Sequence, residues 1–407
     1  MIRFLTAGES HGEVLIAVLD GVPAGLSLTP ADIDRDLARR QLGYGRGRRM
    51  VIEQDHVEIL SGVRRGQTIG SPITLAIRNR DWVNWQYTMS IDAEPDATLP
   101  GARREPVTRP RPGHADLSGG LKYQRDDMRD ILERASARET AARVAAGAVA
   151  RTVLAQLGIQ IVSHVTAIGG AAVSDPLAYD FSTVAALTDE DGVRCADPVV
   201  GTAMRAAVDM AREAGDTVGG VFEVIAHGVP PGLGSHVQWD RKLDGQLAQA
   251  LMSIQAIKAV GIGRGPEVGG LPGSQVHDEI LLADGQPSGT LPTLKRPTNR
   301  AGGLEGGITN GEDLRVSAWM KPISTLMKPL RSVNTATMKE EPATIERSDV
   351  CAVPAAAVVG EAMVCLVLAN AALEKFGGDT MEEITRAARH WETLTRTRLA
   401  PSMEDMR

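Results

Sequence analysis

The sequence has 407 residues, of which 43% are hydrophobic and 3% aromatic, and it carries a formal net charge of −7. Nucleic-acid-binding proteins usually present a basic domain or stacking aromatic rings, so this composition argues against them. We find no apolar run of membrane-spanning length and no signal peptide. The three cysteines are odd in number and lack metal-binding spacing, which is typical of a reduced cytoplasmic protein.

Helix caps and hydrophobic patterns predict the secondary structure. Thr29 precedes Pro30 and Asp32, a typical helix start, and Ser136 precedes Glu139 in a capping-box pattern. Apolar runs predict the strands. In chain order, we expect strands at 2–7 and 14–19, a helix at about 30–43, strands at 57–60 and 73–77, a helix at about 136–158, strands at 159–166 and 221–226, a helix at about 240–261, a strand at 314–320 and a helix at about 354–377.

An internal echo links two distant strand-turn-helix units. Residues 14–26 align without gaps on residues 221–233, and both carry a strand into a Gly-Val-Pro-x-Gly-Leu turn. Either the similarity is chance, or the fold has two similar halves, about 1–160 and 218–407, that share one core. No linker divides the chain, so we expect a single domain over 1–407. Strands and helices mixed without regular alternation predict an α+β fold with largely antiparallel sheets.

Two glycine-rich segments are basic although the chain is acidic. Residues 35–49 carry six arginines against Asp36, and residues 103–111 carry four against Glu105. Clustered like charges cost free energy unless an anion fills the cluster. A small phosphorylated or carboxylated ligand fits better than nucleic acid, and a solvated arginine-rich face is the alternative for the first segment.

Two histidines lie in loops framed by small residues. His11 stands between Ser10 and Gly12, and His114 follows Gly113 in a Pro-rich loop. This framing leaves both rings accessible, and nearby anions would favour their protonated forms. Asp116 is placed to orient His114 or to cap a turn.

The familiar nucleotide and metal signatures are missing. The glycines at 43–47 and 261–265 lack dinucleotide spacing, no P-loop is present, and no spacing suggests a metal site. The glycine-rich run 298–311 contains Arg300 and Glu305, which favours a shaped ligand-contacting loop over a flexible linker. Lys321 to Thr325 then offers a cation and two hydroxyls, which suit a phosphate.

Eight segments stand out along nearly the whole chain: 8–12, Arg40 with 43–47, 109–116, 133–140, 255–258, 299–307, 321–325 and 347–349. Together, and in this order, they resemble the chorismate synthase family. The resemblance implies an anti-1,4-elimination that converts 5-enolpyruvylshikimate 3-phosphate to chorismate and phosphate, with reduced FMN but no net redox change. It also implies a cytoplasmic homotetramer whose subunit is a β-α-β sandwich with two similar halves and helices between the sheets.

The resemblance also implies a role for individual residues. The family's catalytic histidines map onto His11 and His114, and its catalytic aspartate maps onto Asp349. Arg40 and Arg46 fall where the family holds an anionic ligand, described in some members as NADP. The flavin contacts map onto Arg134, Ala135, Ser136, Gln255, Ala256, Gly306, Lys321, Pro322, Ile323, Ser324, Thr325 and Arg347.

This interpretation gives each catalytic group a task. His11 is the acid toward the leaving phosphate, His114 stabilises reduced flavin near N1, and Asp349 assists N5. We expect a monofunctional lyase supplied with reduced FMN from outside, because no dinucleotide fingerprint precedes a helix. A binding module with structural histidines and an ordinary flavin oxidoreductase stay open as alternatives. Residues 172–215 carry no family signature, and the tail at about 380–407 is expected to be variable or disordered.

Overall fold

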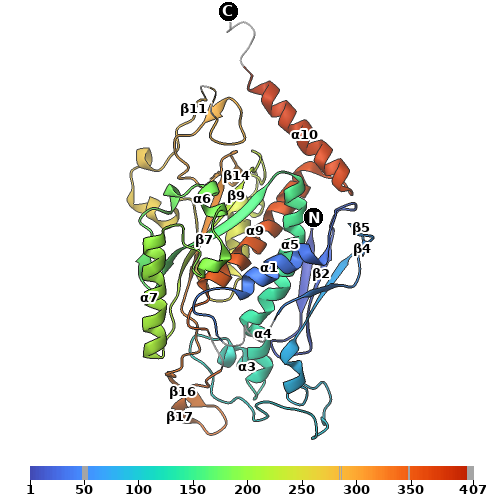
Figure 1. Ribbon diagram of the computed structural model, residues 1–407, viewed down its shortest axis with the longest axis vertical. Helices are drawn as coiled ribbons and strands as arrows, with labels where there is room; N and C mark the ends of the chain where they lie inside the picture. The colour runs from blue at the N-terminus through green and yellow to red at the C-terminus, as the bar shows by residue number, and fades with distance from the viewer. Residues whose placement is uncertain (48–53, 284, 286, 347–348, 401–407) are drawn as a thin grey trace, which may run out of the picture.

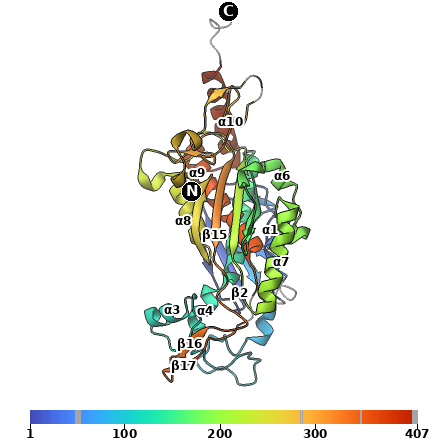
Figure 2. The same ribbon diagram turned by 90° about the vertical axis from the view of Figure 1, so that its left-hand side faces the viewer.

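The fold of this computed structural model, which describes residues 1–47, 54–283, 285, 287–346 and 349–400, is built on two antiparallel sheets (Figures 1 and 2). The first has the strand order β1-β2-β6-β3 and the second β10-β15-β9-β7-β8. The strands of the sheets are β1 (Arg3–Ala7), β2 (Val14–Asp20), β3 (Val57–Ile59), β6 (Ile73–Arg78), β7 (Gln160–Ile168), β8 (Ala171–Ala172), β9 (Gly220–His227), β10 (Ile257–Ile262) and β15 (Leu314–Met320). Short hairpins pair β4 (Val63–Arg64) with β5 (Gln67–Thr68), β11 (Leu281–Leu282) with β12 (Leu294–Lys295), β13 (Leu304–Glu305) with β14 (Ile308–Thr309), and β16 (Arg331–Asn334) with β17 (Lys339–Pro342).

Helices fill the space between the sheets (Figure 1). They are α1 (Pro30–Gln41), α5 (Thr140–Gln156), α8 (Leu243–Met252) and α9 (Val353–Phe376). Helix α5 contacts β2 and β6 of the first sheet and β7 of the second, and it crosses α9 closely, since a Cβ built at Gly147 would lie 2.4 Å from Ala362 Cβ. The sheets and helices share one buried apolar cluster. The predicted α+β sandwich with helices between its sheets is therefore confirmed.

The two halves of the sandwich have the same topology. Each runs strand, strand, helix, strand, strand, helix, and each sheet places these strands in the order first, second, fourth, third. The first half uses β1, β2, α1, β3, β6 and α5, and the second uses β7, β9, α8, β10, β15 and α9. The sequence echo therefore pairs β2 with β9. The second half begins at β7, ahead of the boundary at 218, because an insertion separates β7 from β9.

That insertion is the 172–215 region, and it covers the outer face of the second sheet. It contains α6 (Phe181–Ala185) and α7 (Pro198–Ala214), which contact β7, β8 and β9 (Figure 2). Beneath it, His164 Nε2 lies 2.9 Å from Glu223 Oε2, and Arg315 also pairs with Glu223. All three side chains are buried, so the insertion shields this group of polar side chains on the sheet from water.

Three sequence predictions were wrong. Helix α8 ends at Met252 and β10 begins at Ile257, because Ala256 adopts a left-handed backbone with φ +69° that no helix continues through. The tail forms α10 (Met381–Arg398), which a capping box at Thr380 opens, so the predicted disorder is wrong for this helix. The third wrong prediction is that no apolar run reaches membrane-spanning length. Helix α9 is apolar and long enough to span a membrane, but 89% of its most apolar window is buried inside the fold.

A buried carboxylate ties the helix layer to the second sheet. Glu361 of α9 is fully buried and accepts hydrogen bonds from Arg39 of α1, Arg151 of α5, Ser163 of β7 and Arg194, at 2.5–3.1 Å. Burial by itself would raise the pKa of Glu361, but the arginine charges hold it well below its ordinary value.

Candidate active site

His11 lies in the loop between β1 and β2 and is held by a carboxylate from α4 (Arg129–Ala135). Its Nδ1 is 2.9 Å from both carboxylate oxygens of Glu133, and its backbone N–H donates to Oε2 of the same group. The ring stacks on Trp85, with 3.8 Å between ring centroids. Only 8% of His11 is exposed, so its orientation is fixed by contacts on two sides.

His114 is held in the same way from its own loop, just before α3 (Asp116–Tyr123). Its Nδ1 lies 2.5 Å from Oδ1 of Asp116, which is fully buried. Arg111 binds both carboxylate oxygens of Asp116 and also donates to Thr325 Oγ1. The loop therefore places His114 beside the 321–325 segment, where a Cβ on Gly113 would lie 3.6 Å from Lys321 Nζ.

Both histidines thus have a carboxylate at Nδ1, but the two sites differ at Nε2. In His114, Arg111 Nη2 also lies 3.0 Å from Nδ1 and 3.4 Å from Nε2. Burial would raise the pKa of Glu133, but its hydrogen bonds with His11 and the charge of Arg129 hold it below its ordinary value. Burial would likewise raise the pKa of Asp116, but His114 and Arg111 hold it far below. Both carboxylates are therefore ionised near neutral pH, as acceptors for an Nδ1 proton must be.

A buried cluster of two guanidinium groups and a carboxylate is linked to the His11 loop by hydrogen bonds through Ser136 and Ser10. Arg40 and Arg138 both donate to Asp55 Oδ2, at 2.8 and 2.7 Å, and all three side chains are at least 95% buried. Burial lowers the pKa of Arg40. Two guanidinium groups therefore share one carboxylate. The backbone N–H of Arg138 also donates to the Ser136 hydroxyl, which in turn donates to the Ser10 hydroxyl. Such a cluster favours an anionic ligand.

Arg46 and Asp349, predicted separately as an anion-binding and a catalytic residue, are ion-paired with each other. Gly47 N–H also donates to Asp349 Oδ1 at 2.7 Å, and Gly45 carbonyl accepts from Val350 N–H. The pair joins the two halves of the chain at the site. Arg347, predicted to contact flavin, lies outside the described residues.

Most of the predicted flavin residues come together in two neighbouring groups. Arg134, which precedes Ala135 in the chain, donates to the backbone carbonyls of Thr6 and Gly8. Gln255 donates to Glu139 in the same region. Ala256 carbonyl then accepts from Lys321 N–H, which links this group to the 321–325 segment. Burial and the nearby Lys258 lower the pKa of Lys321.

One predicted residue lies apart from these groups. Gly306 forms the turn between β13 and β14, and the nearest side chain to a Cβ built there is His236, at 4.0 Å. Within the described residues, no bond connects this turn with the histidine loops. Gly306 is therefore the one described member of the predicted flavin set that these contacts do not bring into the site.

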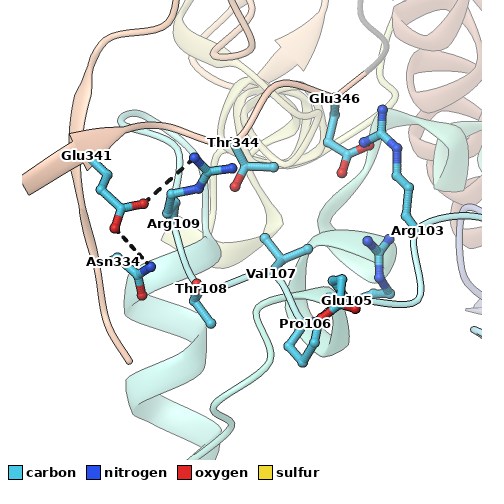
Figure 3. A pocket seen from close by; sticks show the side chains of 11 residues that line it. Arg103, Glu105, Pro106, Val107, Thr108, Arg109, Asn334, Glu341, Thr344 and Glu346 are labelled. Atoms are coloured by element: carbon cyan, nitrogen blue, oxygen red, sulfur yellow. Dashed lines mark hydrogen bonds and ion pairs between the residues drawn. The ribbon is translucent and has the colours of Figure 1, made fainter. Parts of the chain in front are cut away.

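Two cavities flank the site. One of about 450 Å³ has an apolar wall that includes Trp319 and Val221, and it opens beside Lys258, Lys321 and Pro322. The other, of about 340 Å³, lies between the 103–109 segment and the β16–β17 hairpin (Figure 3). Its arginines are matched by acids, for example Arg103 with Glu346, so it offers no surplus charge for a multiply anionic ligand.

Sequence reasoning missed several residues of this site. Glu133, Arg138 and Arg111 stand inside recognised motifs but were given no role. The partners of Glu133 and Arg138 are distant in sequence, whereas Arg111 binds the nearby Asp116. Asp55 and Trp85 had no motif to mark them. Among the described residues, no group of three or more His, Cys, Asp and Glu side chains could hold a metal ion.

Comparisons with known proteins agree with this geometry. A family model described as chorismate synthase matches residues 2–373. A chorismate synthase from Moorella thermoacetica is 58% identical over 384 residues, covering 94% of this chain and 96% of that protein. One from Geobacter sulfurreducens is 56% identical over 391 residues, covering 95% and 97%. A crystal structure of chorismate synthase is 43% identical, with a TM-score of 0.76, and covers 97% of this chain and 98% of that chain.

Proposed function

Because the chain belongs to the chorismate synthase family, we propose that it converts 5-enolpyruvylshikimate 3-phosphate to chorismate and inorganic phosphate, in the shikimate pathway of aromatic biosynthesis. The observation that carries the proposal is an oriented histidine whose loop is hydrogen-bonded, through Ser136, to a buried cluster of two guanidinium groups. The substrate bears two carboxylates and a phosphate, which need cationic partners of this kind.

The reaction is an elimination that balances without an oxidant. A C–O bond to phosphate breaks, a C–H bond on the same ring breaks, and a second ring double bond forms. His11 Nε2 donates a proton to the departing phosphate, and Arg40 and Arg138 offset its charge. Arg46 binds the substrate from the second side, and Asp349 keeps its guanidinium oriented.

The residues of the site suit reduced FMN. The apolar wall at Trp319 fits a ring system, and Lys321 and Lys258 fit a phosphate. Gln255 Oε1 is buried and has no hydrogen-bond partner among the residues that the structure describes. When bound, reduced FMN supplies an electron-rich ring that promotes phosphate loss and takes up the ring hydrogen. In this proposal, residues 134–136, 255–256, 306, 321–325 and 347 hold the flavin, and His114 and Asp349 supply protons and charge to it.

The remaining features of the proposal follow the family. The protein is a monofunctional carbon–oxygen lyase of the cytoplasm, forms a homotetramer and receives reduced FMN from a separate source. Arg40 and Arg46 bind the substrate, and NADP is an alternative ligand for this pair. Light scattering in solution tests the tetramer, and titration with NADPH tests the alternative ligand.

One anaerobic experiment tests the function. We would supply photoreduced FMN and the phosphorylated enolpyruvyl substrate, and follow chorismate and phosphate. We expect many turnovers per reduced flavin and no turnover with oxidised FMN plus NADPH. One product per flavin would show an ordinary oxidoreductase, and binding without turnover would show a binding module. Turnover with oxidised FMN and NADPH would refute monofunctionality alone.

A further inference from the structure

We propose that Glu133 is the positioning residue of His11, and that its buried carboxylate fixes the proton on Nδ1 and reserves Nε2 for proton transfer to the leaving phosphate. The kinetic tests of this proposal rest on the proposed function. The assignment of the tautomer rests on the geometry of His11 and Glu133 alone.

The hydrogen bonds define which nitrogen carries the proton. Both Glu133 oxygens lie 2.9 Å from His11 Nδ1, and Oε2 also accepts the His11 backbone N–H at 2.9 Å. An ionised carboxylate only accepts hydrogen bonds, so Nδ1 must be the donor. In the neutral ring, Nε2 is then the bare nitrogen, and any proton gained or given at the site passes through it.

The surroundings keep Glu133 ionised. Its side chain is 1% exposed, and Arg129 Nη1 lies 3.2 Å from Oε1, one helical turn away on α4. Burial would raise the pKa of Glu133, but the bonds with His11 and the charge of Arg129 lower it. Among the described residues, the charged groups in contact with the His11 ring or with Trp85 are Glu133 and Arg129 from α4, and Asp81, which accepts the Trp85 Nε1–H at 3.0 Å. The Arg138–Asp55 pair lies further off and is linked to the His11 loop through Ser136 and Ser10.

The ring cannot turn to present its other nitrogen without breaking these contacts. Trp85 stacks on His11 at an interplanar angle of 24°, and Trp85 is itself 99% buried. A flipped ring would place Cδ2 against the Glu133 carboxylate and remove the ring donor from a buried charge. The loss of this hydrogen bond favours the observed orientation.

The chain offers a matched control elsewhere. His164, Glu223 and Arg315 form the same histidine–carboxylate–arginine arrangement on the outer face of the second sheet, with a 2.9 Å His–Glu distance. Glu223 is 1% exposed, as Glu133 is. His164 faces its carboxylate with Nε2 rather than Nδ1 and lies apart from the site, so Glu223→Gln reports what the loss of a buried, histidine-bound carboxylate does to the fold.

The first test needs no substitution. Nitrogen NMR of the unmodified protein with 15N-labelled histidine reads the tautomer of each ring, and His11→Ala identifies the His11 signals. We expect a protonated Nδ1 and a bare Nε2 in neutral His11. The opposite tautomer, or an averaged mixture, would overturn the proposal whether or not the proposed reaction takes place.

The second test is a double-mutant cycle. Glu133→Gln should lower kcat at least about tenfold with little change in KM, because the ring keeps its place but loses its fixed tautomer. In a His11→Ala background the same substitution should change kcat less than about twofold, since its effect passes through the ring. Glu223→Gln should leave kcat unchanged. Equal effects of Glu133→Gln in both backgrounds would show that Glu133 only supports the fold.

The third test uses the sign of a pH shift. His11 acts in its protonated form, so activity declines on the alkaline side of the pH profile. Glu133→Gln removes a negative neighbour and should move this limb to lower pH. Arg129→Gln removes a positive one and should move it to higher pH, and it remains informative if Glu133→Gln does not fold. Shifts in the same direction, or no shifts, would contradict the assignment.

Discussion

Glu361→Gln is the substitution that most directly tests what holds the helix layer to the second sheet. The variant keeps the size of the side chain but removes its charge, which leaves the buried Arg194 and the partly buried Arg39 and Arg151 around a neutral amide. Breaking a buried ion pair from one side costs about 3–5 kcal/mol. We expect a folded protein that is destabilised by this amount.

The thermal shift follows from the length of the chain. At about 2.1 cal/mol/K per residue, 407 residues give an unfolding entropy of roughly 0.85 kcal/mol/K. A loss of about 3–5 kcal/mol therefore lowers Tm by roughly 4–6 °C, measured calorimetrically at one scan rate. The matched control is Glu382→Gln on α10, which breaks an exposed 2.6 Å pair with Arg386 and should shift Tm by about 1 °C or less.

The pH dependence provides a second check. The folded pKa of Glu361 lies well below its ordinary value of 4.5, so its contribution is fully present above that pH and is lost as pH falls through the folded pKa. The gap in Tm between wild type and variant should be constant near neutral pH and close in acid. Equal shifts in Glu361→Gln and its exposed control would refute the reasoning, as would a gap that widens in acid.

Three further substitutions test the site and its frame. His114→Ala should lower turnover roughly 100- to 10,000-fold with an unchanged circular dichroism spectrum, and near-normal turnover would remove this ring from the mechanism. Arg46→Ala should weaken substrate binding about 10- to 100-fold and FMN binding less, in parallel titrations, and unchanged substrate affinity would place Arg46 outside the binding site. Gly147→Ala places a methyl group 2.4 Å from Ala362 Cβ and should cost about 1–3 kcal/mol in chemical denaturation, whereas unchanged stability would mean that α5 and α9 separate freely.

The sequence predicted the elements that depend on local patterns, and the structure added the contacts between residues far apart in the chain. The strands and α9 were predictable because their hydrophobic patterns agree with their burial. The helix predicted at 240–261 failed because Ala256, with its left-handed backbone, carries no glycine-like signal. Helix α10 had a visible capping box at Thr380, but its charged surface resembled a solvated tail.

The same distinction holds within the site. His11 and His114 were recognisable because small residues frame them, and Asp116 is close enough in sequence to be noticed. The carboxylate of His11 is 122 positions away, and no periodicity connects the two residues. Asp55 belongs to no motif, and its role appears only when the segment before β3 meets α1, which carries Arg40, and the turn before α5, which carries Arg138.

The close crossing of α5 and α9 fixes the distance between the two sets of charged residues that precede these helices. Helix α5 begins two residues after Arg138, and α9 begins four residues after Asp349, so one helix anchors the charges of the first half and the other those of the second. Gly147 and Ala362 meet about two to three turns from these starts, with no long side chain that could adjust. If the proposed substrate contacts hold, the distance between these two sets of charges is fixed by backbone contact in the core, and we expect that reshaping the surrounding loops alone does not admit a longer molecule.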